Sequence, residues 1–261
     1  MRPFLTHFLV PLRSEHGFTL METLVAMVTG LVVTGALLAI LEFSMREQSQ
    51  ITDRVQANQI GRTAMSNIVD ELHSSCTGAR PIQEPSTTPE SPLAKSNGVN
   101  LWFISAYGTA NSGEALVKEA YEHDITWQRE KTGSNLGAIT DYSFKASSGN
   151  SQEGWVFPTP LGPLKATGTT GKTRIIASNV LESSSIFKYY KYNSSGQLTE
   201  IPSTELPLAS VATAENVAQV TVSFTQAPES KQTSSDRTAA FSDSVVMRLD
   251  PTTSEEVTPC E

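Results

Sequence analysis

The residue of this 261-residue chain that most suggests chemistry is Glu22, a carboxylate at the start of the most apolar segment. The 19 residues from Thr23 to Leu41 carry no charge, and the next charged residue is Glu42. In a helix this run spans about 30 Å, which is close to the hydrocarbon thickness of a bilayer. A carboxylate at the edge of such a segment costs on the order of 3 kcal/mol to insert, so Glu22 is predicted to have a function.

The residues before and around Glu22 form the run Gly17-Phe18-Thr19-Leu20-Met21-Glu22. This run resembles the class III signal of type IV pilins and type II secretion pseudopilins, usually Gly-Phe-Thr-Leu-(Ile/Val)-Glu. The resemblance extends over about residues 13–75, with Met21 as a mild departure. It implies that a prepilin peptidase cuts between Gly17 and Phe18 and methylates the new N-terminus of Phe18. Glu22 is then the fifth mature residue.

A pairing of opposite charges would explain a glutamate at this position. After cleavage, Phe18 carries a charged amine that also lies in the membrane. In a staggered bundle of subunits, Glu22 of one subunit can lie beside the amine of its neighbour, so that each buried charge has a partner. Two other interpretations are an ordinary secretory signal peptide and a plain single-pass anchor. A signal peptide has a shorter apolar core and a small-residue cleavage site after it, which this sequence lacks.

The charge distribution predicts which side of the membrane the chain occupies. The formal net charge is −8, and the 17-residue leader holds Arg2, Arg13 and Glu15, so the mature chain is about −9. An acidic chain without a basic patch is not expected to bind nucleic acid. Positive charge before the apolar run, against Glu42 and Glu47 after it, favours a cytoplasmic N-terminus and an exported domain.

The two cysteines, Cys76 and Cys260, both fall in the part predicted to be exported. An even number of cysteines there predicts a disulfide, which would contribute about 4–5 kcal/mol because the closed loop is long. Two unpaired thiols are the alternative. With only His73 and His123 in the mature chain, a zinc site is not expected, and no other metal or cofactor is predicted.

A single long helix is predicted from Phe18 to about Ser74. Residues 18–41 form its transmembrane half, and residues 42–76 form an amphipathic half with apolar side chains at helical spacing: Ala57, Ile60, Ala64, Ile68 and Leu72. A proline is common in pilins at the position of Ala39, and its absence favours a pseudopilin or minor pilin. Residues 77–261 are predicted to be a β-rich globular domain.

Short segments with strand-like composition recur through that domain, separated by turns and polar loops. An antiparallel sheet packed on the long helix is therefore expected, an α+β fold of pilin type. The order of elements is most similar to large minor pilins of the PilW type and to pseudopilin J. Residues 81–97 and 158–173 are predicted to be loops. The predicted strands are Val99–Ala106, His123–Arg129, Ile139–Lys145, Trp155–Phe157, Arg174–Val180 (strand or short helix), Ile186–Tyr192, Gln197–Ile201, Val217–Thr225 and Ser244–Leu249.

The catalytic and ligand-binding motifs in the domain are weak. Ser185-Ile186-Phe187-Lys188 matches Ser-x-x-Lys without its companion motifs, and residues 168–173 resemble a phosphate loop whose first glycine is replaced by Ala166. Asn193-Ser194-Ser195 is a glycosylation sequon that turn chemistry explains. The three carboxylates between Asp250 and Glu256 follow no calcium-loop spacing. No catalytic residue is predicted, and the chain is not expected to be an enzyme.

The resulting hypothesis is a structural subunit of a pilus or secretion pseudopilus, present in few copies or at the tip. Its expected partners are prepilin peptidase, other pilin or pseudopilin subunits and the membrane. The alternative is a membrane-anchored adhesin or binding domain that does not assemble into a filament. An exported enzyme is a third hypothesis, without a supporting group of residues.

Overall fold

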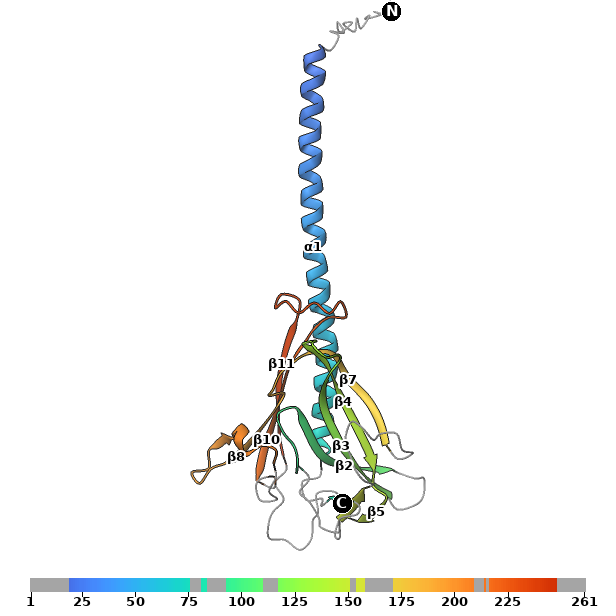
Figure 1. Ribbon diagram of the computed structural model, residues 1–261, viewed down its shortest axis with the longest axis vertical. Helices are drawn as coiled ribbons and strands as arrows, with labels where there is room; N and C mark the ends of the chain where they lie inside the picture. Colours follow the sequence, from blue (N-terminus) through green and yellow to red (C-terminus); the bar gives the residue numbers. More distant parts are fainter. Residues whose placement is uncertain are drawn as a thin grey trace, which may run out of the picture. The chain divides into compact units, whose positions relative to one another are not determined.

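The structure is a computed structural model that describes residues 19–75, 81–83, 93–109, 117–150, 154–157, 171–208, 214 and 216–247. The chain divides into two compact units, Met1–Ser49 and Gln50–Glu261. The second unit therefore contains most of the segment predicted as the amphipathic half of the helix. The fold belongs to the α+β class, with one long helix and a large antiparallel sheet (Figure 1).

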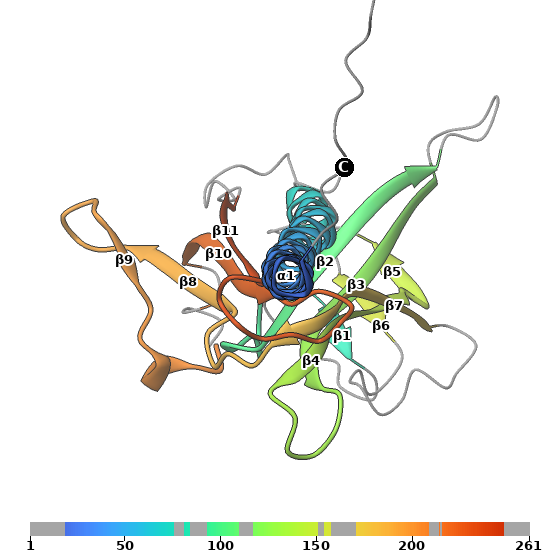
Figure 2. The same ribbon diagram turned by 90° about the horizontal axis from the view of Figure 1, so that it is seen from above.

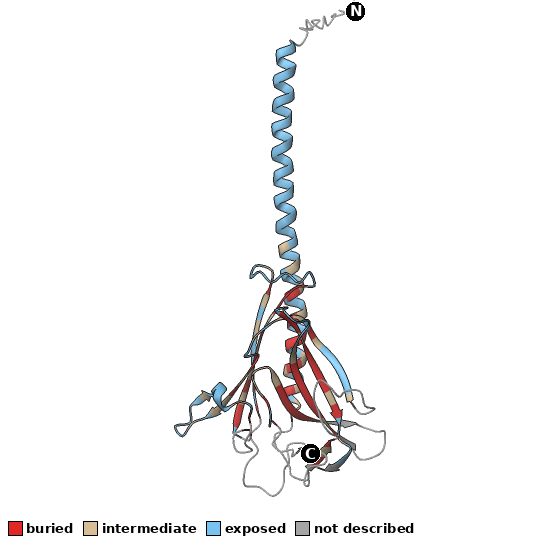
Figure 3. Ribbon diagram, viewed as in Figure 1, coloured by how far each residue is buried: buried red, intermediate tan, exposed pale blue. Residues whose placement is uncertain are grey.

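Helix α1 (Leu20–His73, 54 residues) is a single element that ends within a residue of the predicted position. Every described residue from Thr19 to Ser49 is exposed, including fifteen large apolar side chains (Figure 3). By length and composition, α1 is the one helix in the described part of the chain that could cross a membrane. The structure is thus compatible with a single-pass anchor near the N-terminus.

The main sheet has eight strands, and every pair in it is antiparallel. The strands follow the order β2-β3-β4-β7-β10-β8-β9, and β11 pairs with β10. Their bounds are β2 Asn100–Thr109, β3 Val117–Arg129, β4 Leu136–Lys145, β7 Gly171–Leu181, β8 Phe187–Tyr192, β9 Leu198–Glu200, β10 Val217–Gln226 and β11 Ala239–Val246.

A second sheet of three short strands departs from the predicted all-antiparallel arrangement. It contains β1 (Pro81–Gln83), β6 (Gly154–Phe157) and β5 (Ser148–Asn150), and β1 runs parallel to β6. Strand β1 falls in a segment predicted to be loop because of its prolines. Trp155 and Phe157 of β6 pack with Ile104 and Ala120 of the main sheet in a small apolar cluster of their own.

The principal core lies between the Gln50–His73 part of α1 and one face of the main sheet. Figure 2, which looks along the helix, shows β10 and β11 on one side of it and β2 and β3 on the other. The buried helix residues are Ala57, Gly61, Ala64, Met65, Ile68 and Leu72, which recur at helical spacing. Complete burial of a side chain such as Ile68 or Leu72 contributes about 1.5–3 kcal/mol relative to exposure. The predicted amphipathic stripe is therefore largely confirmed.

Most of the predicted strands are present, with differences at their ends. The aromatic hairpin is confirmed as β8–β9, with Tyr189 fully buried and a turn in which Gly196 has φ +73°. Strand β3 begins six residues before the predicted start, and β7 extends into the segment predicted to be loop. The last strand was predicted at Ser244–Leu249, whereas β11 covers Ala239–Val246, so that Phe241 can pack on the helix.

A substitution at Gly61 tests the close packing of helix and sheet. A Cβ added there would overlap the Phe241 ring, so Gly61→Ala must displace that ring. Overpacking of this kind costs about 1–3 kcal/mol, and we expect a loss of that size in urea unfolding although alanine favours helices. Gly35→Ala is the matched control, because a Cβ at Gly35 has no atom within 4 Å. Equal effects of the two substitutions would contradict this packing.

Candidate functional site

The structure describes only part of the site predicted from the sequence. Gly17 and Phe18, the predicted cleavage site, lie outside the described residues, as do both predicted disulfide partners, Cys76 and Cys260. Processing and disulfide formation therefore stay predictions. Glu22 is described, and its surroundings can be examined directly.

Glu22 lies in the first turn of α1, three residues after the residue that caps the helix. The Glu22 backbone N–H donates to Thr19 Oγ1 at 3.3 Å, which places threonine at the N-cap and glutamate three residues later. Glu22 is exposed, and no described residue of the same chain forms an ion pair with it. A carboxylate is favoured at this end of a helix by the positive end of the helix dipole. It is thus held at the helix terminus and open to a partner from outside the chain.

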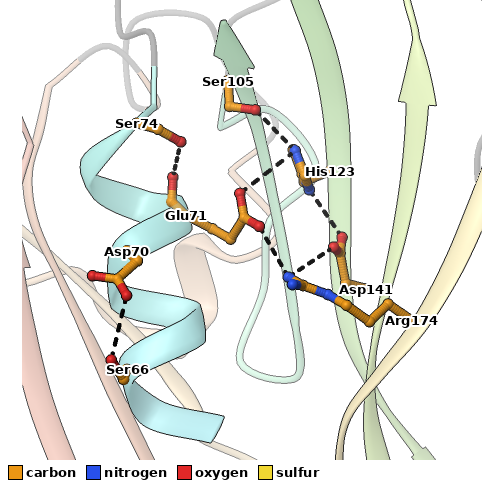
Figure 4. Close-up of polar contacts among 8 residues, drawn as sticks. All are labelled: Ser66, Asp70, Glu71, Ser74, Ser105, His123, Asp141 and Arg174. Carbon is orange, nitrogen blue, oxygen red and sulfur yellow. Dashed lines mark hydrogen bonds and ion pairs between the residues drawn. The ribbon is translucent and has the colours of Figure 1, made fainter. Parts of the chain in front are cut away.

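A second group of polar residues, which the sequence did not single out, lies between α1 and the main sheet (Figure 4). We call it the helix–sheet cluster; its members are Glu71 of α1, Ser105 of β2, His123 of β3, Asp141 of β4 and Arg174 of β7. The strand register brings the four sheet residues together. Asp141 is opposite Arg174, and His123 is two positions diagonal from both Ser105 and Asp141. The cluster forms a polar row across four adjacent strands.

His123 makes the central contacts of the helix–sheet cluster. Its Nδ1 lies 3.0 Å from Asp141 Oδ1, and its Nε2 lies 2.9 Å from Ser105 Oγ. When Nδ1–H donates to Asp141, Nε2 accepts from the Ser105 hydroxyl. The imidazole also stacks on the Phe103 ring, with centroids 5.0 Å apart and planes 9° apart. These contacts fix the ring on both edges and one face.

Arg174 links the helix to the sheet. Its Nη2 donates to Glu71 Oε1 at 2.9 Å and lies 3.5 Å from Asp141 Oδ2. Glu71 Oε2 in turn lies 3.9 Å from His123 Nε2. The side chains of Asp141 and Glu71 are only 4% and 16% exposed, whereas that of Arg174 is 47% exposed. The half-exposed guanidinium of Arg174 therefore forms ion pairs with two largely buried carboxylates.

The order of hydrogen bonds, serine to Nε2 and aspartate to Nδ1, is that of an acyl-transfer triad. Three features oppose that chemistry. Ser105 is completely buried, and the Glu71 carboxylate lies near the same Nε2. The cluster also adjoins the last turn of α1, where the helix dipole is negative, and a negative potential destabilises the oxyanion that acyl transfer must form. The geometry instead suits a link that holds the end of α1 on the sheet.

Sequence reasoning missed the helix–sheet cluster because its members are far apart in the chain. His123 was considered only as a zinc ligand, and among the described residues no group of three His, Cys, Asp or Glu could hold a metal. One signal was present in the predicted strand His123–Arg129. At every second position, His123 is followed by the apolar residues Ile125 and Trp127, so the three share one face of the strand. A histidine on that face is expected to be buried and therefore to need polar partners.

The other weak motifs do not form sites in the described part of the chain. Ser185 is exposed just before β8, and Lys188 forms an ion pair with Glu200 at 3.3 Å. The described end of the phosphate-loop-like segment, residues 171–173, is the start of β7. Asn193 Oδ1 accepts from the backbone N–H groups of Ser195 and Gln197, as a turn residue does. Residues 250–256 lie outside the described residues.

Comparisons of this chain with protein-family models, with curated proteins and with solved structures found no match.

Substitution of Arg174 tests the helix–sheet cluster. We expect Arg174→Gln to lower the free energy of unfolding by about 2–3 kcal/mol, because two buried carboxylates lose their cation. The double variant with Glu71→Gln should cost at least 1 kcal/mol less than the sum of the single variants, since like-charge repulsion is then removed. Urea unfolding of the full chain in detergent measures both.

Arg129→Gln is the matched control for this experiment. Arg129 pairs with Glu182 at the surface, where the side chains are 40% and 44% exposed. Its loss should cost under about 1 kcal/mol. Strictly additive effects at Glu71 and Arg174, or equal effects at Arg174 and Arg129, would show that the cluster does not couple helix to sheet.

Proposed function

We propose that this chain is a minor pilin or pseudopilin of the type IV pilin family. It is processed by a prepilin peptidase between Gly17 and Phe18 and enters a pilus or secretion pseudopilus by helix packing. The observation that carries the proposal is Glu22, the one carboxylate at the start of a 19-residue uncharged run, which ends the sequence Gly17-Phe18-Thr19-Leu20-Met21-Glu22. A plain membrane anchor is not expected to contain that carboxylate, because inserting a carboxylate at the edge of a bilayer costs free energy.

The geometry of the α1 N-terminus supports the pairing of Glu22 with another subunit. Thr19 caps the helix, so helical backbone geometry is already established at Glu22. With the carboxylate exposed, a neighbour's N-terminal amine can approach it without displacing another side chain. In a low-dielectric bundle such a pair is retained, because separation leaves two unpaired charges.

The exposed apolar surface of α1 supports assembly through the helix. Fifteen large apolar side chains between Leu20 and Met45 are exposed in the single chain. Lipid can cover them while the subunit is in the membrane, and neighbouring helices can cover them in a filament. The β-rich unit is large for a repeating subunit, which favours few copies or a position at the tip.

The N-terminus of the mature protein tests the processing step. We expect mass spectrometry of protein from cells with an active prepilin peptidase to find N-methylated Phe18 as the first residue. Cells without the peptidase are the control and should retain Met1. Retention of Met1 in both strains, or a cut well after Leu41, would overturn the proposal and favour an anchored binding domain.

Substitution of Glu22 tests the assembly step. We expect Glu22→Ala to leave processing and membrane insertion intact but to reduce filament incorporation at least tenfold, measured by immunoblot of sheared filaments. Glu42→Ala is the matched control, because Glu42 lies in the same helix and already pairs with Arg46 at 2.5 Å. Normal incorporation of Glu22→Ala would exclude the pairing, even if Phe18 is methylated.

A further inference from the structure

Strand β3 also carries Asp124, a buried ionisable residue on the sheet face opposite the helix–sheet cluster. Asp124 follows His123 directly, so its side chain points away from α1. It is 1% exposed, and neither carboxylate oxygen has a hydrogen-bond partner among the residues that the structure describes. A buried carboxylate ion without partners is strongly disfavoured, so the protonation state of this group needs a structural explanation.

Two neighbours on β2 supply that explanation. Trp102 is directly opposite Asp124 in the register, and Asn100 lies two residues earlier on the same face. Trp102 Nε1 and Asn100 Oδ1 are also buried, and within the described part of the chain neither has a hydrogen-bond partner. One is a donor and the other is an acceptor. A carboxylate can accept from the indole N–H but offers nothing to an amide oxygen, whereas a carboxylic acid can satisfy both.

We infer that Asp124 is a buried proton-binding site, held as a neutral carboxylic acid that accepts from Trp102 and donates to Asn100. Protonation of Asp124 then stabilises the folded chain, and this contribution is lost as the pH rises. This inference is independent of the proposed function, because it rests on the packing of β2 and β3 alone.

The ionisable groups around Asp124 also favour its neutral form over its ionised form. Asp141 on β4 adds repulsion, and Glu122, also buried, lies two residues earlier on the same face of β3. On β4, Tyr142 is opposite Asp124 in the register, and its hydroxyl donates to Gln128. The ammonium group of Lys95 has its Nζ 5.0 Å from the centroid of the Trp102 ring. These residues give the ionised form of Asp124 little compensation.

Burial is the largest cause of the shift and raises the pKa of Asp124 from 3.8 to about 7. A hydrogen bond from the Trp102 indole to the ionised form lowers the pKa, and repulsion from Asp141 raises it. A hydrogen bond from Asn100 would also lower the pKa, but only with the amide N–H turned toward Asp124, whereas the buried Asn100 atom without a partner is Oδ1. In the unfolded chain the carboxyl group ionises near its ordinary value. Between the two values the folded state therefore binds more protons than the unfolded state. The stability that Asp124 contributes is greatest below the unfolded pKa, falls as the pH rises through this window, and levels off above the folded pKa.

The pH dependence of unfolding tests this inference on the full chain in detergent. Asp124→Asn mimics the neutral acid, since its amide can donate to Asn100 and its oxygen can accept from Trp102. We expect the variant to match the wild type near pH 4. Between about pH 5 and pH 7 the folding constant of the wild type should fall relative to the variant by close to tenfold per pH unit.

Asp243→Asn is the matched control, because Asp243 is exposed on β11 and its loss should leave the pH profile of the wild type unchanged. Parallel profiles for the wild type and Asp124→Asn would overturn the inference. If Asp124→Asn does not fold, infrared spectroscopy of the wild type tests the inference instead. Infrared difference spectra should show a protonated carboxylic acid that is lost with a midpoint near pH 7. A titration without such a band would also overturn it.

Discussion

The packing of the Gln50–His73 part of α1 against the main sheet is the constraint on which the rest of the domain depends. The first residues of the buried stripe are small, namely Ala57, Gly61 and Ala64, and larger side chains follow at Ile68 and Leu72. At Gly61 the absence of a side chain leaves room for the Phe241 ring, so β11 can approach the helix closely. The core strands must then present their apolar faces to this one helix, which fixes their register.

The helix–sheet cluster adds directional contacts to a core that is otherwise apolar. Apolar contacts alone tolerate small rotations and translations of a helix, because any apolar neighbour is acceptable. Glu71 and Arg174 do not tolerate such movements of the helix, since each needs an opposite charge at hydrogen-bonding distance. Compared with apolar residues of similar volume, such a network contributes little net stability. Its effect is to penalise registers of α1 in which Glu71 or Asp141 would be buried without Arg174.

The sequence predicts the elements of this fold better than its contacts. Strong periodicity located α1, β2, β10 and the β8–β9 hairpin to within a few residues. The start of β3 was missed because Lys118, Glu119 and Glu122 obscure its alternation, and the start of β11 because Ser242 and Asp243 are polar. In both strands, pairing with a neighbour outweighs local composition. The helix–sheet cluster could not be predicted, since it depends on the register of four strands and the rotation of α1.

Two consecutive residues of β3 show how strand geometry decides the state of an ionisable group. His123 points toward α1, where Ser105 and Asp141 provide a partner for each ring nitrogen. Asp124 points to the opposite face, where the available groups are an indole donor and an amide oxygen. A proton on Asp124 supplies the missing donor, so neutralisation replaces ion pairing as the way to bury the charge. One strand thus buries adjacent polar residues by two different physical means, and the neutralisation of Asp124 makes its contribution to stability depend on pH near neutrality.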